Sequence, residues 1–268
     1  MKAGTTSLWY YLQDHPAVFC PRPKEINYFI GTGPHWAKGL EWYESLFDGA
    51  GVALARGEGS PAYAMAPVFD GVPARIAAVV PEVRLIYSVR HPIERMRAQW
   101  AHRVAMGRER RPAEEALRDD PNYLSVSKYA YQLERYLEHF PRDQILVITS
   151  EALRAERAEV MRSVYSFVGV DETWTSDTID EELHRTADKP LRSPMRAWFA
   201  SRGLLGLVRS VTPSRMRSWY TRRATRTPLD ASVSAELIAR LSDELTSDLE
   251  RLREIAGPQI DRWGLVPR

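Results

Sequence analysis

The chain has 268 residues, of which 44% are hydrophobic and 27% charged, and its formal net charge is +2. This composition is typical of a globular protein with a substantial core, whereas the small net charge argues against a general polyanion-binding protein. A single cysteine, Cys20, excludes an internal disulfide framework, and no signal peptide or apolar run of about 20 residues is visible, so a cytoplasmic location is predicted.

The first predicted element is a glycine- and hydroxyl-rich turn that leads into a helix over residues 5–14. Gly4 allows close approach of the backbone to a ligand, and Lys2 adds a positive charge. The start of the helix supplies N–H groups and hydroxyls from Thr5, Thr6 and Ser7. The pattern predicts a phosphate or sulfate site, although a capped surface helix is an alternative. A kinase or ATPase of the P-loop type is disfavoured, because its lysine follows the last glycine.

Strand and helix patterns then alternate along the chain. Short apolar runs predict strands at residues 18–20, 52–55, 84–89 and 145–148. Helical spacing predicts helices over residues 36–47, 72–80, 93–106, 128–140, 152–168 and 234–255, whereas the charged stretch 107–121 is predicted to be a loop. This alternation predicts a single α/β domain over residues 1–268, with a parallel sheet whose strands end at the ligand site.

Residues 185–226 differ in composition from the rest of the chain. They contain eleven arginines and lysines against one acid, Asp188, with aromatic and aliphatic residues interleaved. This mixture predicts an insertion-like segment that contacts either an anionic membrane surface or a phosphate-bearing ligand. A basic helix docked on the core is the alternative interpretation.

Five segments resemble, in order, the sulfotransferases that use 3′-phosphoadenosine 5′-phosphosulfate (PAPS), especially the heparan-sulfate-type and bacterial carbohydrate sulfotransferases. Residues 2–8 resemble the 5′-phosphosulfate loop, and residues 23–29 resemble the K-E-x-H-F-F segment. Residues 39–43 and 58–63 match two further segments, and residues 90–95 resemble the R-[DN]-P-x-x-R signature of the 3′-phosphate site. The resemblance implies a P-loop-like three-layer α/β fold with a central parallel sheet flanked by helices.

The resemblance also implies roles in sulfuryl transfer, in which positioned cations and N–H donors stabilise the developing negative charge. Lys2 is expected on the leaving phosphate or the sulfuryl oxygens, and Arg90 on the 3′-phosphate. The 5′-phosphate is expected on Gly4, Thr5, Thr6 and Ser7, and the loop that closes the nucleotide site on Lys189 and Arg192. No metal is expected.

Glu25 is implied as the general base that accepts the proton of the acceptor hydroxyl. The alternative for Glu25 is a surface acid paired with Lys24. His15 and His35 are rival bases, although His15 precedes a proline at a helix end, which favours a structural role.

Three departures from the family pattern affect these expectations. A serine that binds the 3′-phosphate is replaced by Ala98, for which Gln99 or Arg97 are candidate substitutes. The lysine that some relatives carry in E-K-[ST]-P-A-Y is Gly59, so one catalytic cation is missing from its usual position. The histidine of K-E-x-H-F-F is Asn27, which bears on acceptor contacts.

The sequence therefore predicts a PAPS-dependent sulfotransferase that acts on a hydroxyl of a sugar or glycolipid, with no nucleic-acid partner. A P-loop kinase, or a non-catalytic relative that binds nucleotide or membrane, is the alternative; the basic segment would place the protein at the membrane periphery. In the family a buried strand leads into the phosphate loop, whereas this sequence starts inside the turn. We therefore expect the functional polypeptide to extend upstream of Met1 by at least one strand, because buried strand edges without partners are costly.

Overall fold

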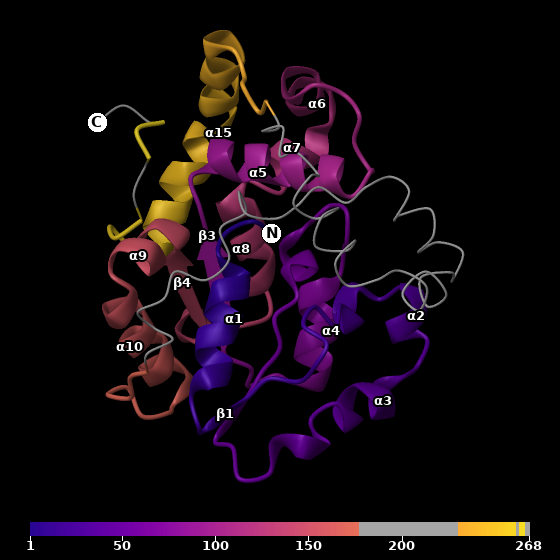
Figure 1. The fold of residues 1–268 in the computed structure, drawn as a ribbon, viewed down its shortest axis with the longest axis vertical. Coiled ribbons are helices and arrows are strands. Elements are labelled where there is room, and N and C mark those ends of the chain that lie inside the picture. Colours follow the sequence, from indigo (N-terminus) through magenta and orange to yellow (C-terminus); the bar gives the residue numbers. More distant parts are fainter. Residues whose placement is uncertain (177–229, 261–262, 266–268) are drawn as a thin grey trace, which may run out of the picture.

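The computed structural model describes residues 1–176, 230–260 and 263–265 (Figure 1). In these residues β1 (Val18–Phe19) pairs in parallel with β2 (Ala55–Arg56), and β3 (Leu85–Val89) pairs in parallel with β4 (Ile145–Thr149). The described strands thus form two separate parallel pairs rather than the one continuous sheet that the alternation predicts. The expected strand upstream of Met1 lies outside this sequence and stays a prediction.

Helices flank these strands, and most of the predicted helices begin and end close to their predicted positions. They are α1 (Thr5–Asp14), α2 (Gly33–Trp36), α3 (Leu40–Ser45), α4 (Val72–Val79), α5 (Pro92–Ala105), α6 (Ala113–Asp119), α7 (Pro121–Ser125), α8 (Tyr129–Leu137), α9 (Ser150–Ala155), α10 (Arg157–Val168) and α15 (Ala235–Ala256). Short 3-10 turns lie at η1 (Tyr28–Ile30), η2 (Asp48–Ala50), η3 (Pro61–Ala64) and η4 (Arg142–Gln144).

The β3–β4 pair is covered by helices on both faces, because successive residues of a strand point to opposite sides. Ile145 and Val147 of β4 belong to a core built with residues of α4, α5, α6, α8 and α15. Ile148 belongs to a second core built with residues of α1, α9 and α10. Figure 1 shows α9 and α10 on one side of the pair and α4 on the other. The predicted three-layer α/β arrangement is confirmed.

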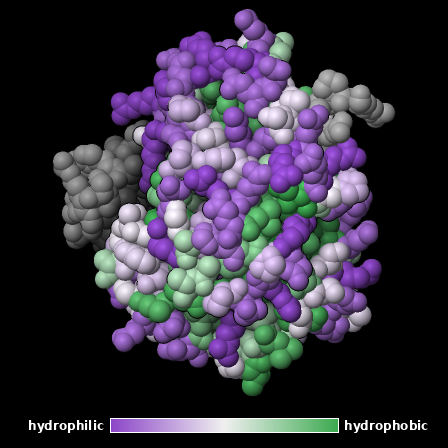
Figure 2. Space-filling model, turned by 180° about the vertical axis from the view of Figure 1, so that it is seen from behind, coloured by the Kyte–Doolittle hydropathy of each residue, from purple (hydrophilic) through white to green (hydrophobic). Residues whose placement is uncertain are grey.

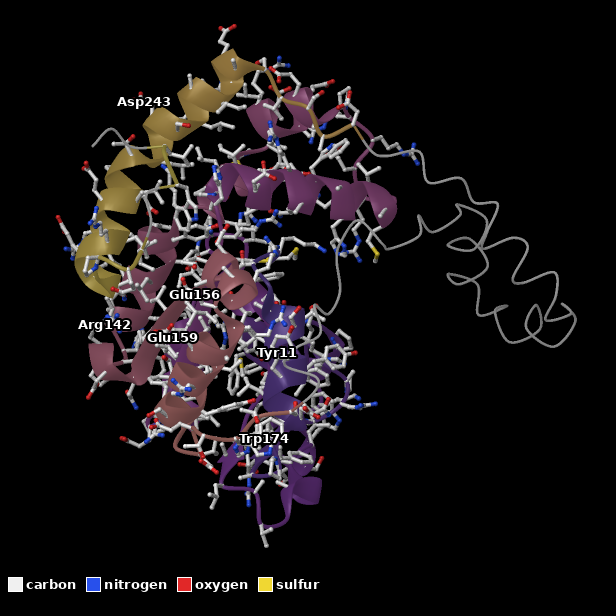
Figure 3. All side chains as sticks on the ribbon, turned by 60° about the vertical axis from the view of Figure 1, so that its left-hand side comes forward. Tyr11, Arg142, Glu156, Glu159, Trp174 and Asp243 are labelled. Atoms are coloured by element: carbon white, nitrogen blue, oxygen red, sulfur yellow. The ribbon has the colours of Figure 1, made fainter. Side chains whose placement is uncertain are left out.

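Two predicted helices are each divided in the structure. The helix predicted over 152–168 is broken at Glu156, whose φ of −128° and ψ of 44° end α9 and begin α10. The helix predicted over 36–47 is divided at Gly39, where φ is 80°. Figure 3 shows Glu156 and Glu159 at the start of α10, and Tyr11 on the neighbouring α1. The Tyr165 hydroxyl of α10 donates to the Tyr11 carbonyl over 3.1 Å, which fixes the two helices together.

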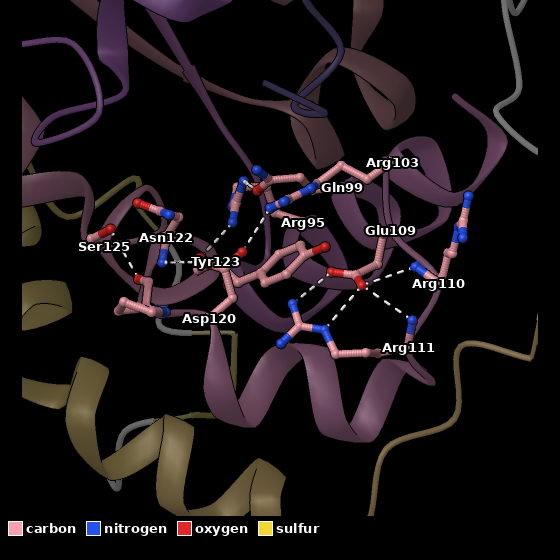
Figure 4. A network of polar contacts seen from close by, with 11 residues as sticks. Arg95, Gln99, Arg103, Glu109, Arg110, Arg111, Asp120, Asn122, Tyr123 and Ser125 are labelled. Atoms are coloured by element: carbon pink, nitrogen blue, oxygen red, sulfur yellow. Dashed lines mark hydrogen bonds and ion pairs between the residues drawn. The ribbon is translucent and has the colours of Figure 1, made fainter. Parts of the chain in front are cut away.

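The prediction of a loop over 107–121 is wrong, because this stretch contains α6. Most residues of α6 are charged, but Ala113, Ala116 and Leu117 form an apolar face that is buried. The turn before α6 is held by Glu109, whose side chain is only 5% exposed and lies 2.8 Å from the Arg111 guanidinium (Figure 4). The Glu109 carboxylate also accepts from the backbone N–H groups of Arg110 and Arg111.

The surface is mixed in character. Figure 2 shows hydrophilic residues over the upper part of one face and hydrophobic residues gathered lower down. The connection between α3 and β2 exposes two aliphatic side chains, with 99% exposure for Val52 and 75% for Leu54. Within the described ranges, the longest apolar helical stretch falls short of what a membrane span requires.

Candidate active site

The turn that precedes α1 has the backbone geometry of an anion-binding loop. Gly4 is in the left-handed region, with φ of 80° and ψ of 3°, and stands at the N-cap of α1. Its carbonyl accepts the first helical hydrogen bond, from Leu8 over 3.1 Å. Gly4 has no side chain with which to cap the helix, and the first turn carries no acidic residue. The helix dipole and the N–H groups of Thr5, Thr6 and Ser7 therefore favour an anion at this end.

Two strand ends meet this turn. The Ser88 hydroxyl of β3 donates to the Ala3 carbonyl, and the Arg90 guanidinium lies 3.5 Å from the Lys2 carbonyl. A Cβ placed on Gly4 would stand 3.5 Å from the Cβ of Ser150, which follows β4. Lys2, Gly4 and Arg90 are thus brought to one edge, at the carboxyl ends of β3 and β4, where parallel sheets bind ligands.

The start of α5 forms a small network of charges around Arg90. Glu94 lies 3.7 Å from Arg90 and 2.8 Å from Arg97. Gln99 is buried and its amide oxygen accepts a 2.6 Å hydrogen bond from Arg95, so only its NH2 group is left to replace the serine that the family has at Ala98, and this role stays a prediction. Arg97 is 27% exposed and paired with Glu94, and its role at the 3′-phosphate stays a prediction as well.

Glu25 lies in the segment between β1 and η1. Its carboxylate is 3.2 Å from the Lys24 ammonium, and its side chain is 51% exposed. The pairing with Lys24 that the alternative interpretation expects is therefore present. A half-exposed carboxylate is still open to an acceptor hydroxyl, so the pairing leaves the role of general base as a prediction. Glu25 has φ of 66°, and its carbonyl accepts from the Asn27 side chain over 3.0 Å.

Glu58 holds the Glu25 segment in place, and sequence reasoning missed this role. Its carboxylate accepts hydrogen bonds of 2.5 Å from both the Ser60 and the Tyr63 hydroxyl. Those hydroxyls in turn accept from the backbone N–H groups of Asn27 (2.9 Å) and Phe29 (3.2 Å). Burial raises the pKa of Glu58, and these hydrogen bonds oppose the rise. The spacing of the acid, serine and tyrosine within 58–63 is the signal that could have revealed the network.

The two rival bases have different surroundings. His15 is 2% exposed, its Nδ1 accepts from the Ala17 N–H over 3.0 Å, and its Nε2 therefore donates to the Asp171 carbonyl. Both ring nitrogens of His15 are engaged, which supports the structural role predicted for it. His35 donates from Nδ1 to the Ile26 carbonyl over 2.5 Å, so His35 stays a rival base beside the Glu25 segment.

The remaining predicted site residues cannot be placed. Lys189, Arg192 and the whole segment 185–226 lie outside the described residues. Their predicted roles, in closing the nucleotide site and in contacting an anionic surface, stay predictions. Among the residues with described positions, no group of three or more His, Cys, Asp and Glu side chains is arranged to hold a metal ion.

Comparison with known sequences matches most of the chain to one family. The family described as “Sulfotransferase domain” matches residues 1–197. The bifunctional heparan sulfate N-deacetylase/N-sulfotransferase 2 of Homo sapiens is 29% identical over 194 residues, which are 63% of this chain and 21% of the relative. The heparan sulfate glucosamine 3-O-sulfotransferase 5 of Mus musculus is 30% identical over 182 residues, which are 63% of this chain and 51% of the relative. The chain thus spans about a fifth of the first relative and about half of the second.

A solved structure shares the fold over nearly the whole chain. The crystal structure of a sulfotransferase from Alicyclobacillus acidocaldarius superposes with a TM-score of 0.69 at 22% sequence identity. The match covers 98% of this chain and 94% of that chain, so α15 has a counterpart within the shared fold.

Proposed function

Since this chain belongs to the sulfotransferase domain family, we propose that it transfers a sulfuryl group from PAPS to a hydroxyl group of a carbohydrate or glycolipid. The observation that carries the proposal is the meeting of the Gly4 turn with Arg90 at the ends of β3 and β4. Trp9 of α1 and Lys24, next to Glu25, both border Gly59, so the helix that follows the phosphate turn and the Glu25 segment are neighbours.

The two phosphates of the donor nucleotide suit two elements at this edge of the sheet, the turn before α1 and the end of β3. The left-handed Gly4 and the first amides of α1 suit the 5′-phosphate, because both present N–H groups without an intervening side chain. The Arg90 guanidinium is 24% exposed at the end of β3 and suits the 3′-phosphate, since its rigid fork matches phosphate oxygens. Lys2 is assigned to the oxygen that bridges phosphate and sulfur.

The transfer step follows from these assignments. The acceptor oxygen forms a bond to sulfur as the bond between sulfur and the 5′-phosphate oxygen breaks, and Glu25 takes the hydroxyl proton. The negative charge that collects on the departing phosphate is stabilised by Lys2 and by the N–H groups of α1. The products are a sulfate ester and 3′-phosphoadenosine 5′-phosphate.

The acceptor class is supported by the names of the relatives. Both relatives described above are heparan sulfate enzymes by name, and one is named for transfer to oxygen of a glucosamine. A saccharide hydroxyl is therefore the acceptor that we propose, with a glycolipid as one form in which it is presented.

Two measurements test the proposed function. Calorimetry should detect binding of 3′-phosphoadenosine 5′-phosphate and none of ATP, and radiolabelled PAPS should transfer its label to desulfated heparan sulfate or another saccharide. Binding of ATP in preference would support a P-loop kinase instead. Binding of the 3′-phosphorylated nucleotide without turnover on a panel of saccharides would support a non-catalytic relative, to which Ala98 and Gly59 point.

A further inference from the structure

Three segments distant in sequence meet around Gly59, next in the chain to Glu58 and close to the Glu25 segment. They are α1, which supplies Trp9, the segment before η1, which supplies Lys24, and the turn after β2, which contains Gly59. A Cβ placed on Gly59 would stand 3.5 Å from the Trp9 ring carbon Cδ1 and 3.7 Å from Lys24 Cε. The space beside Gly59 is thus bordered by the edge of the indole and by the end of the lysine side chain.

Both bordering groups are hydrogen-bond donors, one of them buried and the other largely shielded from solvent. Trp9 is 6% exposed, and its Nε1, bonded to the carbon that faces Gly59, is buried with no hydrogen-bond partner among the residues that the structure describes. The Lys24 side chain is 14% exposed, and its ammonium is 3.2 Å from Glu25. A buried N–H without an acceptor costs about 1–3 kcal/mol, and a sheltered ammonium has two further N–H groups to satisfy. Together they favour an anionic oxygen between them.

We propose that Lys24 and the indole N–H of Trp9 bind the oxygens of the sulfuryl group as it passes from PAPS to the acceptor. This inference rests on the proposed function, which supplies the anion. Lys24 thereby takes the place of the lysine that some relatives carry at the position of Gly59, because its Cε borders the same space. The sulfuryl oxygens carry negative charge throughout, so the ammonium and the indole N–H stabilise the transition state while the proton goes to Glu25.

Gly59 offers a direct test, because a side chain can be restored there. Both neighbouring atoms are at ordinary contact distances from a Cβ at this position, so a side chain can begin there without a clash, and Lys24→Met removes the ammonium that would compete with it. The experiment compares Lys24→Met, Gly59→Lys and the double variant Lys24→Met/Gly59→Lys. Lys38→Met is the matched control, since Lys38 is exposed and lies over the Trp42 ring.

Lys24→Met should lower kcat by roughly 10²–10³-fold, as loss of one charge-stabilising donor does, while the affinity for 3′-phosphoadenosine 5′-phosphate stays within about threefold. That nucleotide lacks the sulfuryl group, so its affinity should not depend on Lys24. The double variant should recover at least about tenfold of the lost turnover, because Gly59→Lys returns an ammonium to the same space. Trp9→Phe keeps the ring, loses only the N–H, and should lower kcat roughly tenfold or more.

The outcomes separate this inference from the proposed function. If the wild-type protein transfers no label from PAPS to any saccharide, the proposed function fails. If the wild-type protein transfers label and Lys24→Met does so equally fast, the inference fails alone. A Lys24→Met variant that is slow and is not rescued by Gly59→Lys also overturns it, because Lys24 would then act only by positioning Glu25. Thermal unfolding of each variant beside Lys38→Met identifies any loss that comes from misfolding.

Discussion

At the scale of single residues, the candidate site joins a half-exposed carboxylate to sheltered cations. Glu25 is 51% exposed whereas Lys24 beside it is 14% exposed, so the acid can meet an acceptor from solvent while the lysine faces inward. This difference suits a base and a charge-stabilising group that act on opposite sides of one transferred group. Replacement of Glu25 should therefore remove the acceptor of the proton, whereas replacement of Lys24 should remove a stabilising charge.

Glu25→Gln should lower kcat by roughly 10²–10⁴-fold, because the amide cannot accept the proton of the acceptor hydroxyl. The affinity for 3′-phosphoadenosine 5′-phosphate should stay within a few-fold, since Glu25 has no assigned contact with the nucleotide. Steady-state turnover with radiolabelled PAPS, beside calorimetry, measures both quantities. Turnover close to that of the wild type would rule Glu25 out and direct attention to His35, which donates to the Ile26 carbonyl next to it.

Arg90→Ala and Lys2→Ala should impair different steps. Arg90 is assigned to the 3′-phosphate, so its loss should abolish most of the preference for nucleotides that carry this group. Lys2 is assigned to the bridging oxygen, so its loss should mainly reduce kcat. Competition between 3′-phosphoadenosine 5′-phosphate and adenosine 5′-phosphate measures the first effect. An Arg90→Ala variant that keeps the full preference would place the 3′-phosphate elsewhere.

At the scale of elements, the turn between α5 and α6 depends on one sheltered acid. The Arg111 side chain, with the backbone N–H groups of Arg110 and Arg111, lowers the pKa of Glu109 from its ordinary 4.5 to about 2. A carboxyl whose pKa is lowered on folding stabilises the folded state above the unfolded pKa, and this contribution is lost as the pH falls. The loss should fall between about pH 4.5 and pH 2.

Glu109→Gln should therefore reduce the free energy of unfolding at pH 7 by roughly 1.5–3 kcal/mol, the range for hydrogen bonds to charged groups. The difference from the wild type should shrink as the pH is lowered from 4.5 toward 2, where Glu109 itself becomes protonated. Urea unfolding across this range measures it, with Glu44→Gln at an exposed position as the control. A difference independent of pH would show that the carboxylate charge is not what holds the turn.

The elements differ in how far the sequence predicts them. An element is predicted well where apolar and polar residues alternate with a clear period and where the element has clear ends. The helix at 5–14 and the strand at 145–149 have clear periodicity and clear boundaries, and both were predicted almost to the residue. The helix α6 was missed because its apolar residues are small alanines and one leucine among charges. The phosphate turn and the Glu25 segment were predicted from motifs, since their residues are adjacent in sequence. The Glu58 network has a partial signal in the spacing of its acid, serine and tyrosine, whereas the approach of Trp9 and Lys24 to Gly59 arises from tertiary packing, which leaves no local pattern.

At the scale of the whole molecule, α15 completes the domain from outside the region that the family match covers. It contributes five buried leucines to the core of the β3–β4 pair: Leu237, Leu241, Leu245, Leu249 and Leu252. Its Asp248 carboxylate accepts from the N–H groups of Ala130 (3.1 Å) and Tyr131 (2.9 Å) at the start of α8. Figure 3 shows Arg142 beside the lower end of α15, where it donates to the Ile255 carbonyl over 2.8 Å.

Asp248→Ala should lower the free energy of unfolding by about 1–2 kcal/mol, as removal of a helix N-cap does, because the residue before α8, Lys128, makes no side-chain cap. Asp243→Ala is the matched control, since Asp243 is exposed on the same helix (Figure 3). Chemical denaturation of the two variants beside the wild type measures the difference. Equal stability of Asp248→Ala and Asp243→Ala would mean that the first amides of α8 are satisfied without α15.

The cap on α8 also sets an order of events during synthesis. The ribosome delivers residues 129–137 more than a hundred residues before it delivers Asp248, the group that accepts from two of their first amides. Until α15 emerges, α8 has uncapped amides, and the nascent chain exposes the core surface that the five leucines later cover. The domain therefore cannot reach its final packing while α15 is still in the exit tunnel. Folding of the domain is completed only after α15 has emerged, and until then the aggregation hazard of an exposed core is greatest.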